Sequence, residues 1–245
     1  PMFRAILTIA GLIFASAAHA GERVTVVELF TSQACPNCPP ANELLIDLAQ
    51  RDDILALSWG VDYWDFMGWE DTFGDPAHTR RQRAYNANLK RPGVFTPEMV
   101  IDGRFEVVGS ATDKVMASLQ QARALDRPHY RVEMKEEGGL CIVRLDAANT
   151  EADTTYRVRA VWYKSREAVA ISGGDNAGRT LDYANIVKGS HIVGTWSGDD
   201  EVFRIELGEA ADLGADNLAI LVEDITPGGP LYGAGVLALS HLQAR

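Results

Sequence analysis

The sequence predicts an α/β domain that contains a Cys-x-x-Cys motif, followed by a small antiparallel domain of the β-sandwich kind. Two observations lead to this fold class. Residues 24–125 alternate apolar, strand-like runs with amphipathic helical patterns, whereas residues 130–239 contain short alternating segments separated by polar turns. The segment 126–128 between them, Asp-Arg-Pro, is the predicted linker. We therefore expect an α/β domain at 21–126 and a β-rich domain at 129–245.

The first 20 residues have the pattern of a secretory signal peptide. Arg4 precedes an apolar run from Ala5 to Ala18, and Ala18-His19-Ala20 is an A-x-A cleavage site. The run is too short for a comfortable membrane span, and no later segment approaches ~20 apolar residues. We therefore expect an exported protein, periplasmic or secreted, without stable membrane insertion after cleavage. Cysteines in such a compartment can form a disulfide.

The composition is acidic, with 34 Asp and Glu against 23 Lys and Arg and a net charge of −11. Nucleic acids and anionic membrane surfaces attract clustered basic residues, so this balance argues against both as partners. One basic cluster exists, Arg80, Arg81 and Arg83 followed by Lys90 and Arg91. We interpret it as the solvated face of a short helix rather than as a phosphate site.

The main chemical motif is Cys35-Pro36-Asn37-Cys38, which follows a strand-like run at 24–30 and precedes a helical pattern. A helix N-terminus lowers the pKa of a nearby thiol. We therefore predict that Cys35 lies exposed at the start of the helix and acts as the nucleophile. Cys38, about one turn further on, is predicted to attack the mixed disulfide that forms at Cys35.

The prolines of this region set the expected start of the first helix. Pro36 fits the first helical position, because the N–H that it lacks would have no intrahelical partner. Pro39 and Pro40 each remove a donor from the next turn, which predicts either a kink there or a helix that becomes regular only from Ala41. A mostly apolar run at 54–61 then predicts a strand that is buried on both faces of a parallel sheet.

The Cys-x-x-Cys spacing has two other interpretations, half of a zinc site and a static disulfide. A zinc site normally needs a second Cys/His pair, and the only other cysteine, Cys141, has no His nearby. Cys141 shares a strand face with Val143 and Leu145, which indicates a small buried hydrophobe. We therefore expect no metal and no cofactor, while a structural disulfide between Cys35 and Cys38 stays an alternative.

An aromatic segment at 61–69, Val-Asp-Tyr-Trp-Asp-Phe-Met-Gly-Trp, follows the second predicted strand. Aromatic and Met side chains are usually part of a core, and that is one interpretation. In the functional interpretation, Trp64 and Trp69 form a wall beside the thiols that binds an apolar part of the substrate. Asp62 is then a possible proton acceptor for Cys38.

A proline opens the next predicted strand, at Thr96-Pro97, and the strand ends at Asp102-Gly103. Asp-Gly favours a type I′ hairpin turn. A proline at the start of a central strand predicts a cis Thr96–Pro97 bond. We expect Pro97 to shape the substrate groove, and the backbone of Thr96 to pair with an extended substrate. An amphipathic helix is predicted at 111–125.

The chain resembles the DUF1223 family of secreted thioredoxin-like proteins. The resemblance extends over nearly the whole mature chain and rests on five blocks: 35–41 with both cysteines, 61–69, 81–85, 96–103, and 175–187 with Asp175, Asn176, Gly178, Arg179 and Thr180. It implies a thioredoxin-like domain followed by a small β domain, and it implies no activity. Two residues depart from the pattern: Gly60 replaces a His, and Glu98 replaces a Gln. Glu98 adds a negative charge that should oppose thiolate formation.

Beyond residue 128, alternation predicts seven strands of an antiparallel sandwich. The expected segments are 130–134, 140–145, 155–163, 191–196, 201–207, 217–225 and 235–239. The loop at 172–179 has three glycines but no phosphate-loop spacing. We expect it to lie against the thiol domain, with Asn176 or Arg179 making the contact.

The sequence therefore predicts an exported thiol–disulfide oxidoreductase that uses Cys35 and Cys38, with a thiol or disulfide protein or peptide as its partner. The sequence does not distinguish an oxidase from a reductase or an isomerase, because the direction of electron transfer depends on the reduction potential of the cysteine pair. The alternative is a non-enzymatic secreted binding module. In that case the disulfide is structural and the aromatic segment binds a ligand.

Overall fold

The computed structural model describes residues 23–148, 150 and 154–239. The predicted signal peptide at 1–20 lies outside the described residues. Across these ranges, none of the helices combines the length and the apolar character that a membrane span requires.

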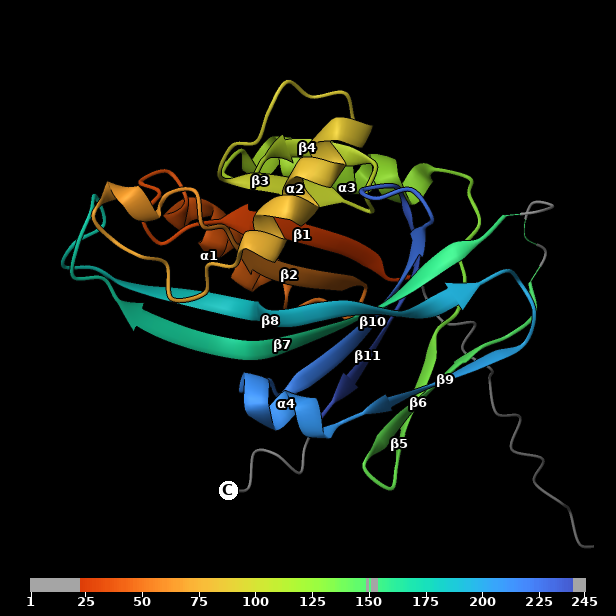
Figure 1. Cartoon of the computed structure of the whole chain (residues 1–245). Helices are drawn as coiled ribbons and strands as arrows, with labels where there is room; N and C mark the ends of the chain where they lie inside the picture. Colours follow the sequence, from red (N-terminus) through yellow and green to blue (C-terminus); the bar gives the residue numbers. More distant parts are fainter. Residues whose placement is uncertain (1–22, 149, 151–153, 240–245) are drawn as a thin grey trace, which may run out of the picture.

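A mixed sheet of eight strands runs through the whole molecule in the order β11-β10-β7-β8-β2-β1-β3-β4 (Figure 1). Its strands are β1 (Thr25–Thr31), β2 (Ile54–Gly60), β3 (Glu98–Ile101), β4 (Phe105–Val108), β7 (Tyr156–Ala170), β8 (Thr180–Trp196), β10 (Asn217–Asp224) and β11 (Leu231–Ala238). β1 pairs parallel with β2 and antiparallel with β3. The predicted buried strand after the first helix is therefore confirmed as β2.

Three helices cover the two faces of the β1–β4 part of this sheet. They are α1 (Pro39–Leu48), α2 (Pro76–Asn88) and α3 (Thr112–Ala124), and a short 3-10 helix, η1 (Asp65–Met67), precedes α2. Successive residues of a strand point to opposite faces. Leu29 therefore packs with α1 and α3, whereas Phe30 packs with Tyr85 of α2. The α1 face and the α2 face of the sheet thus have separate cores.

A second, three-stranded antiparallel sheet packs on the far end of the large sheet (Figure 1). It consists of β5 (Glu133–Glu137), β6 (Leu140–Leu145) and β9 (Glu201–Glu206), and helix α4 (Gly208–Leu213) follows it. Cys141 and Val143 of β6 share a core with Trp162 of β7 and Leu218 of β10. Cys141 is fully buried, as predicted, and burial raises the pKa of its thiol to about 11.

The seven segments predicted after residue 128 each overlap a strand, but they do not form a separate sandwich. Four of the strands, β7, β8, β10 and β11, extend the sheet of the N-terminal half, because Ile186 of β8 pairs parallel with Ser58 of β2. The prediction was incomplete because alternation shows which face of a strand is buried, not which strand lies beside it. The fold is thus a mixed α/β fold with one large mixed sheet and one small antiparallel sheet.

The predicted linker is fixed to both halves of the chain. Arg127 donates to the carbonyl oxygen of Leu231 at 2.6 Å and forms an ion pair with Asp102. Asp102 and Gly103 have φ values of 49° and 65°, which confirms the predicted type I′ turn. The division at 126–128 stays a prediction about folding units, whereas the large sheet is continuous across it.

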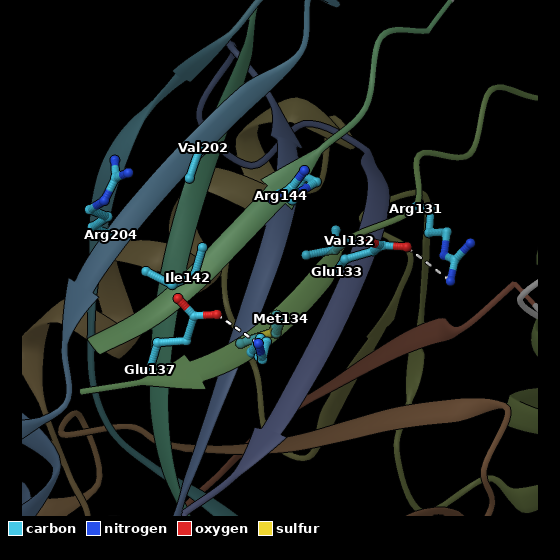
Figure 2. Close-up of a pocket in the computed structure, with 10 residues that line it drawn as sticks. Arg131, Val132, Glu133, Met134, Glu137, Ile142, Arg144, Val202 and Arg204 are labelled. Atoms are coloured by element: carbon cyan, nitrogen blue, oxygen red, sulfur yellow. Dashed lines mark hydrogen bonds and ion pairs between the residues drawn. The ribbon is translucent and has the colours of Figure 1, made fainter. Parts of the chain in front are cut away.

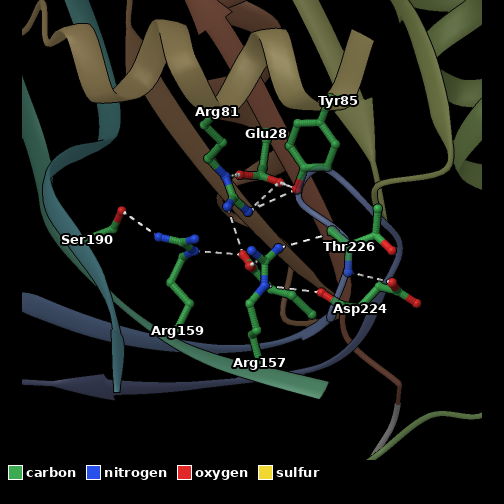
Figure 3. A network of polar contacts seen from close by, with 9 residues as sticks. Glu28, Arg81, Tyr85, Arg157, Arg159, Ser190, Asp224 and Thr226 are labelled. Atoms are coloured by element: carbon green, nitrogen blue, oxygen red, sulfur yellow. Dashed lines mark hydrogen bonds and ion pairs between the residues drawn. The ribbon is translucent and has the colours of Figure 1, made fainter. Parts of the chain in front are cut away.

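A buried ionic network joins α2 to strands of both halves (Figure 3). Arg81 donates to Glu28 of β1 at 2.6 Å and to Glu223 of β10 at 2.7 Å, and Arg159 of β7 donates to Glu223 at 2.8 Å. The side chain of Arg81 is only 10% exposed, so its assignment to a solvated face was wrong. Arg83 is exposed, as predicted. Helical periodicity alone did not reveal that acidic residues of two distant strands face α2.

Candidate functional site

Cys35 and Cys38 form a disulfide between the end of β1 and the start of α1, with their Cα atoms 5.4 Å apart. Helix α1 begins at Pro39, and Cys38 is its N-cap. The predicted placement of Pro36 in the helix and the delayed start at Ala41 were therefore wrong. The first helical residues have no intrahelical acceptor for their N–H groups, so Pro39 and Pro40 are both tolerated there.

Both sulfur-bearing residues are fully buried, at 0% exposure. The prediction of an exposed Cys35 was therefore wrong, and a distant loop contributes to the burial. The side-chain amide of Asn176 donates to the carbonyl oxygens of Gln33 at 2.9 Å and of Cys35 at 3.0 Å. Arg179 donates to the Oδ1 atom of Asn176 at 3.0 Å. The predicted contact between this loop and the thiol segment is thus confirmed.

Gln33 connects three segments around the disulfide. Its Oε1 atom accepts from the indole N–H of Trp69 at 2.8 Å, and its Nε2 atom donates to Thr72 at 2.8 Å. Its backbone carbonyl is one of the two acceptors of Asn176. We call the contacts among Gln33, Trp69 and Asn176 the clasp. Sequence reasoning missed Gln33, because a single glutamine at the end of a strand belongs to no motif.

Asp71 is a buried carboxylate whose contacts reach the same segment. Its Oδ2 atom accepts from the backbone N–H of Gln33 at 2.7 Å, and its Oδ1 atom accepts from the N–H of Phe73 at 2.8 Å. Burial raises the pKa of Asp71 to about 6, although both N–H groups favour the ionised form. Asp62, the acid singled out from the sequence, instead accepts from the hydroxyl of Thr79 on α2 at 2.5 Å.

Pro97 directly precedes β3, which is the strand that pairs with β1. The Thr96–Pro97 bond is cis, as predicted. Glu98 pairs with Phe30 near the end of β1, so the register leads Pro97 towards the segment that contains Cys35. Trp69 reaches Gln33 through the clasp, whereas Trp64 is half-buried. The roles given to Pro97, Thr96, Trp64 and Asp62 in substrate binding or catalysis stay predictions.

Glu98 lies on the α2 face of the sheet, whereas α1 packs on the opposite face. It is fully buried and accepts from the amide groups of Gln82 at 2.5 Å and Asn86 at 2.9 Å. Burial raises its pKa to about 7, although these two donors favour the charged form. Its hydrogen-bond partners are therefore residues of α2, not the thiols.

A scan against family models matches residues 26–223 to DUF1223, which is described as a protein of unknown function. The chain belongs to the DUF1223 family. A search of curated proteins finds no match for it. The family description adds no activity, so the functional interpretation depends on the site.

This DUF1223 chain also resembles solved structures. A structural genomics crystal structure of a protein from Agrobacterium tumefaciens has a TM-score of 0.78 and 29% sequence identity, covering 90% of this chain and 96% of the other. HBP35 of Porphyromonas gingivalis has a TM-score of 0.54 and 14% identity, covering 89% of this chain and 76% of the other. The second likeness concerns the fold alone.

Two cavities of the DUF1223 chain differ in their relation to the disulfide. One of about 340 Å³ lies between α1 and the β7–β8 hairpin, and its lining includes Pro39, next to Cys38, together with Arg166 and Arg179. A larger one of about 790 Å³ lies on β5, β6 and β9 (Figure 2). Its lining has charges of both signs, such as the Arg131–Glu133 ion pair at 3.0 Å. None of the predicted site residues lines this larger cavity.

Within the part of the chain that the structure describes, no group of three or more His, Cys, Asp or Glu side chains has the geometry to hold a metal ion.

Proposed function

We propose that this DUF1223 protein is an exported thiol–disulfide oxidoreductase with a thioredoxin-like domain. The observation that supports this most directly is the Cys35–Cys38 disulfide, which closes immediately before the N-terminus of α1. A helix N-terminus stabilises negative charge, so the reduced pair has a setting that favours a thiolate. The sheet order β2-β1-β3-β4, with helices on both faces, supports the thioredoxin-like assignment.

The proposed reaction exchanges disulfides with a substrate protein or peptide. The Cys35 thiolate attacks one sulfur of the substrate disulfide. The substrate S–S bond breaks, a mixed disulfide forms, and the leaving thiolate takes up a proton. Cys38 then loses its proton and attacks the mixed disulfide, which re-forms the Cys35–Cys38 bond and releases the second substrate thiol. Two electrons pass from the protein to the substrate, and the reverse sequence oxidises a dithiol.

The reduction potential of the pair is the first test. The protein is equilibrated in thiol–disulfide buffers of graded potential and then trapped with an alkylating reagent for mass spectrometry. An exchanging pair should have a potential above about −300 mV, whereas structural disulfides lie below about that value. With Cys38→Ala, Cys35 should accumulate mixed disulfides with exported proteins. A potential well below the limit, together with no trapped protein, would contradict the enzymatic function.

A second candidate function is a binding module with a structural disulfide. Two observations favour it: Cys35 and Cys38 have no exposed surface, and Phe66 and Met67 of η1 are 82% and 38% exposed. Exposed apolar side chains that gather on one loop are typical of a contact surface. In this case Phe66→Ser should weaken binding of a partner, while Cys38→Ala should trap nothing.

The enzymatic function requires the clasp to open, because a buried disulfide cannot be attacked in line. Asn176→Ala removes two hydrogen bonds to the backbone of the thiol segment. A hydrogen bond contributes about 1 kcal/mol net, and one or two kcal/mol shift an equilibrium by a factor of about 5–30. We therefore expect reduction of the disulfide by a water-soluble phosphine to become about tenfold faster in Asn176→Ala.

The matched control for this measurement is Asn88→Ala, which removes an exposed asparagine at the end of α2. Its reduction rate should equal that of the unmodified protein. Equal rates for Asn176→Ala and Asn88→Ala would mean that the clasp does not limit access to the disulfide. The measurement uses only the phosphine, so it does not depend on knowing the biological substrate.

A further inference from the structure

A cleft of about 260 Å³ lies on the α2 face of the large sheet, apart from the disulfide on the α1 side. Four arginines and one serine supply its polar lining: Arg80, Arg81, Arg157, Arg159 and Ser190. Figure 3 shows the last four of these residues. The other described residues of the lining are Ala, Pro and Gly, and none of them is acidic. Such a lining is unusual in a chain with 34 acidic and 23 basic residues.

The carboxylates behind the cleft do not balance the four guanidinium groups. Glu28 pairs with Arg81, and Glu223 is shared by Arg81, Arg157 and Arg159. The hydrogen bonds of Arg157 to the carbonyl oxygens of residues 224 and 226 bring no charge. A third carboxylate nearby, that of Asp224, accepts from the backbone N–H of Thr226. Even with Asp224 counted, three carboxylates stand against four guanidinium groups, so positive charge is left over towards the cleft.

This surplus charge is mostly withdrawn from water. The side chain of Arg81 is 10% exposed, and those of Arg157 and Arg159 are each 17% exposed. A charge that leaves water without a partner is costly, so an anion in the cleft would be stabilised by groups that the fold already holds in place. Arg80 is exposed at the rim and, among the described residues, has no ion-pair partner.

The donors come from several directions. Arg80 and Arg81 belong to α2, Arg157 and Arg159 to β7, and Ser190 to β8. Arg159 donates to the Ser190 hydroxyl at 3.3 Å, which places this hydroxyl beside the guanidinium. Guanidinium forks match the oxygens of phosphate, and a tetrahedral group presents oxygens on more sides than a planar carboxylate does. The volume lies below the about 300 Å³ of ordinary small-molecule pockets, which suits one small group.

We propose that this cleft is a binding site for a phosphate group, either inorganic phosphate or the terminal phosphate of a small molecule. The site is independent of the disulfide chemistry, because it shares no lining residue with the clasp. The sequence did not indicate it, because α2 contributes only half of the arginines. β7 supplies the other half from a distant part of the chain.

The test is calorimetric titration of the full protein with inorganic phosphate and, separately, with glycerol phosphate. Chloride keeps the ionic strength constant, and a third titration with acetate shows how tightly the cleft binds a carboxylate. We expect saturable binding of one phosphate per chain and much weaker binding of acetate. Arg159→Lys keeps the positive charge but loses the two-pronged guanidinium. Because the variant loses a charge-assisted hydrogen bond to the phosphate, we expect it to bind phosphate about tenfold more weakly. Tighter binding of glycerol phosphate would identify a terminal phosphate as the natural ligand, and equal or weaker binding would identify the free ion.

Two variants on the same helix separate a built site from general attraction. Arg80→Gln should weaken phosphate binding several-fold, whereas Arg83→Gln, an exposed arginine outside the cleft, should leave it unchanged. Circular dichroism checks that Arg159→Lys is folded, and the exposed Arg80 tests the site even if that variant is not. No saturable binding, acetate binding as tight as phosphate binding, or equal losses in Arg80→Gln and Arg83→Gln would each overturn the proposal.

Discussion

Arg81→Met is expected to lower the free energy of unfolding by about 3–5 kcal/mol, because it leaves the buried carboxylate of Glu28 without its ion-pair partner and removes one of the three arginines that pair with Glu223. Glu28 is fully buried and Glu223 is 2% exposed, and Arg81 pairs with both. Burial alone would lower the pKa of Arg81, but the carboxylates of Glu223 and Glu28 raise it well above its ordinary value. The loss should be measured by urea denaturation at neutral pH.

Arg83→Met is the matched control for this measurement. Arg83 is on the same helix but exposed, so the substitution should change the free energy of unfolding by no more than about 0.5 kcal/mol. Adding Glu28→Gln to Arg81→Met removes the charge that has lost its partner and should recover part of the loss. If Arg81→Met and Arg83→Met destabilise equally, the network contributes little to the stability that links the two halves of the sheet.

The second large effect is a loss of stability as the pH rises from about 4.5 to about 7. Burial raises the pKa of Glu98 from 4.5 to about 7 and that of Asp71 from 3.8 to about 6. In this window these two carboxyl groups bind more protons in the folded protein than in the unfolded chain, so their contribution to stability falls as the pH rises. Burial lowers the pKa values of His78 and His129, and these two groups act in the opposite direction. The contribution of the two carboxyl groups is fully present below the unfolded pKa values. It is lost once the pH passes the folded pKa values.

Each of the two groups contributes about 3 kcal/mol to this change, since one pKa unit corresponds to about 1.4 kcal/mol. Glu98→Gln should therefore make the fall in stability between these pH values smaller by about 3 kcal/mol and leave the contribution of Asp71. The measurement is denaturant unfolding at a series of pH values between 4 and 8. Glu70→Gln, which changes an exposed glutamate, should leave the profile as it was. Identical profiles for Glu98→Gln and the unmodified protein would contradict the prediction.

Several features of the candidate site were predictable because neighbouring residues determine them. The Cys35–Cys38 disulfide needs only the short spacing of the two cysteines, and the Asp102-Gly103 turn needs only two residues that tolerate positive φ. A contact of Asn176 or Arg179 with the thiol domain was also predicted, although it joins residues 141 positions apart and local pattern does not determine it. Alternation likewise identified strands in the C-terminal half, and Cys141 as a buried residue.

By itself, the sequence determined where strands, turns and the cysteine pair lie along the chain, because these depend on local periodicity and backbone preference. Only the tertiary structure decided that Ile186 of β8 pairs with Ser58 of β2, which makes one sheet from both halves. That pairing brings Arg159 beside Arg81 and closes the clasp over Cys35. Strand order, and hence the burial of these groups, depends on contacts between residues far apart in the chain, which no local pattern records.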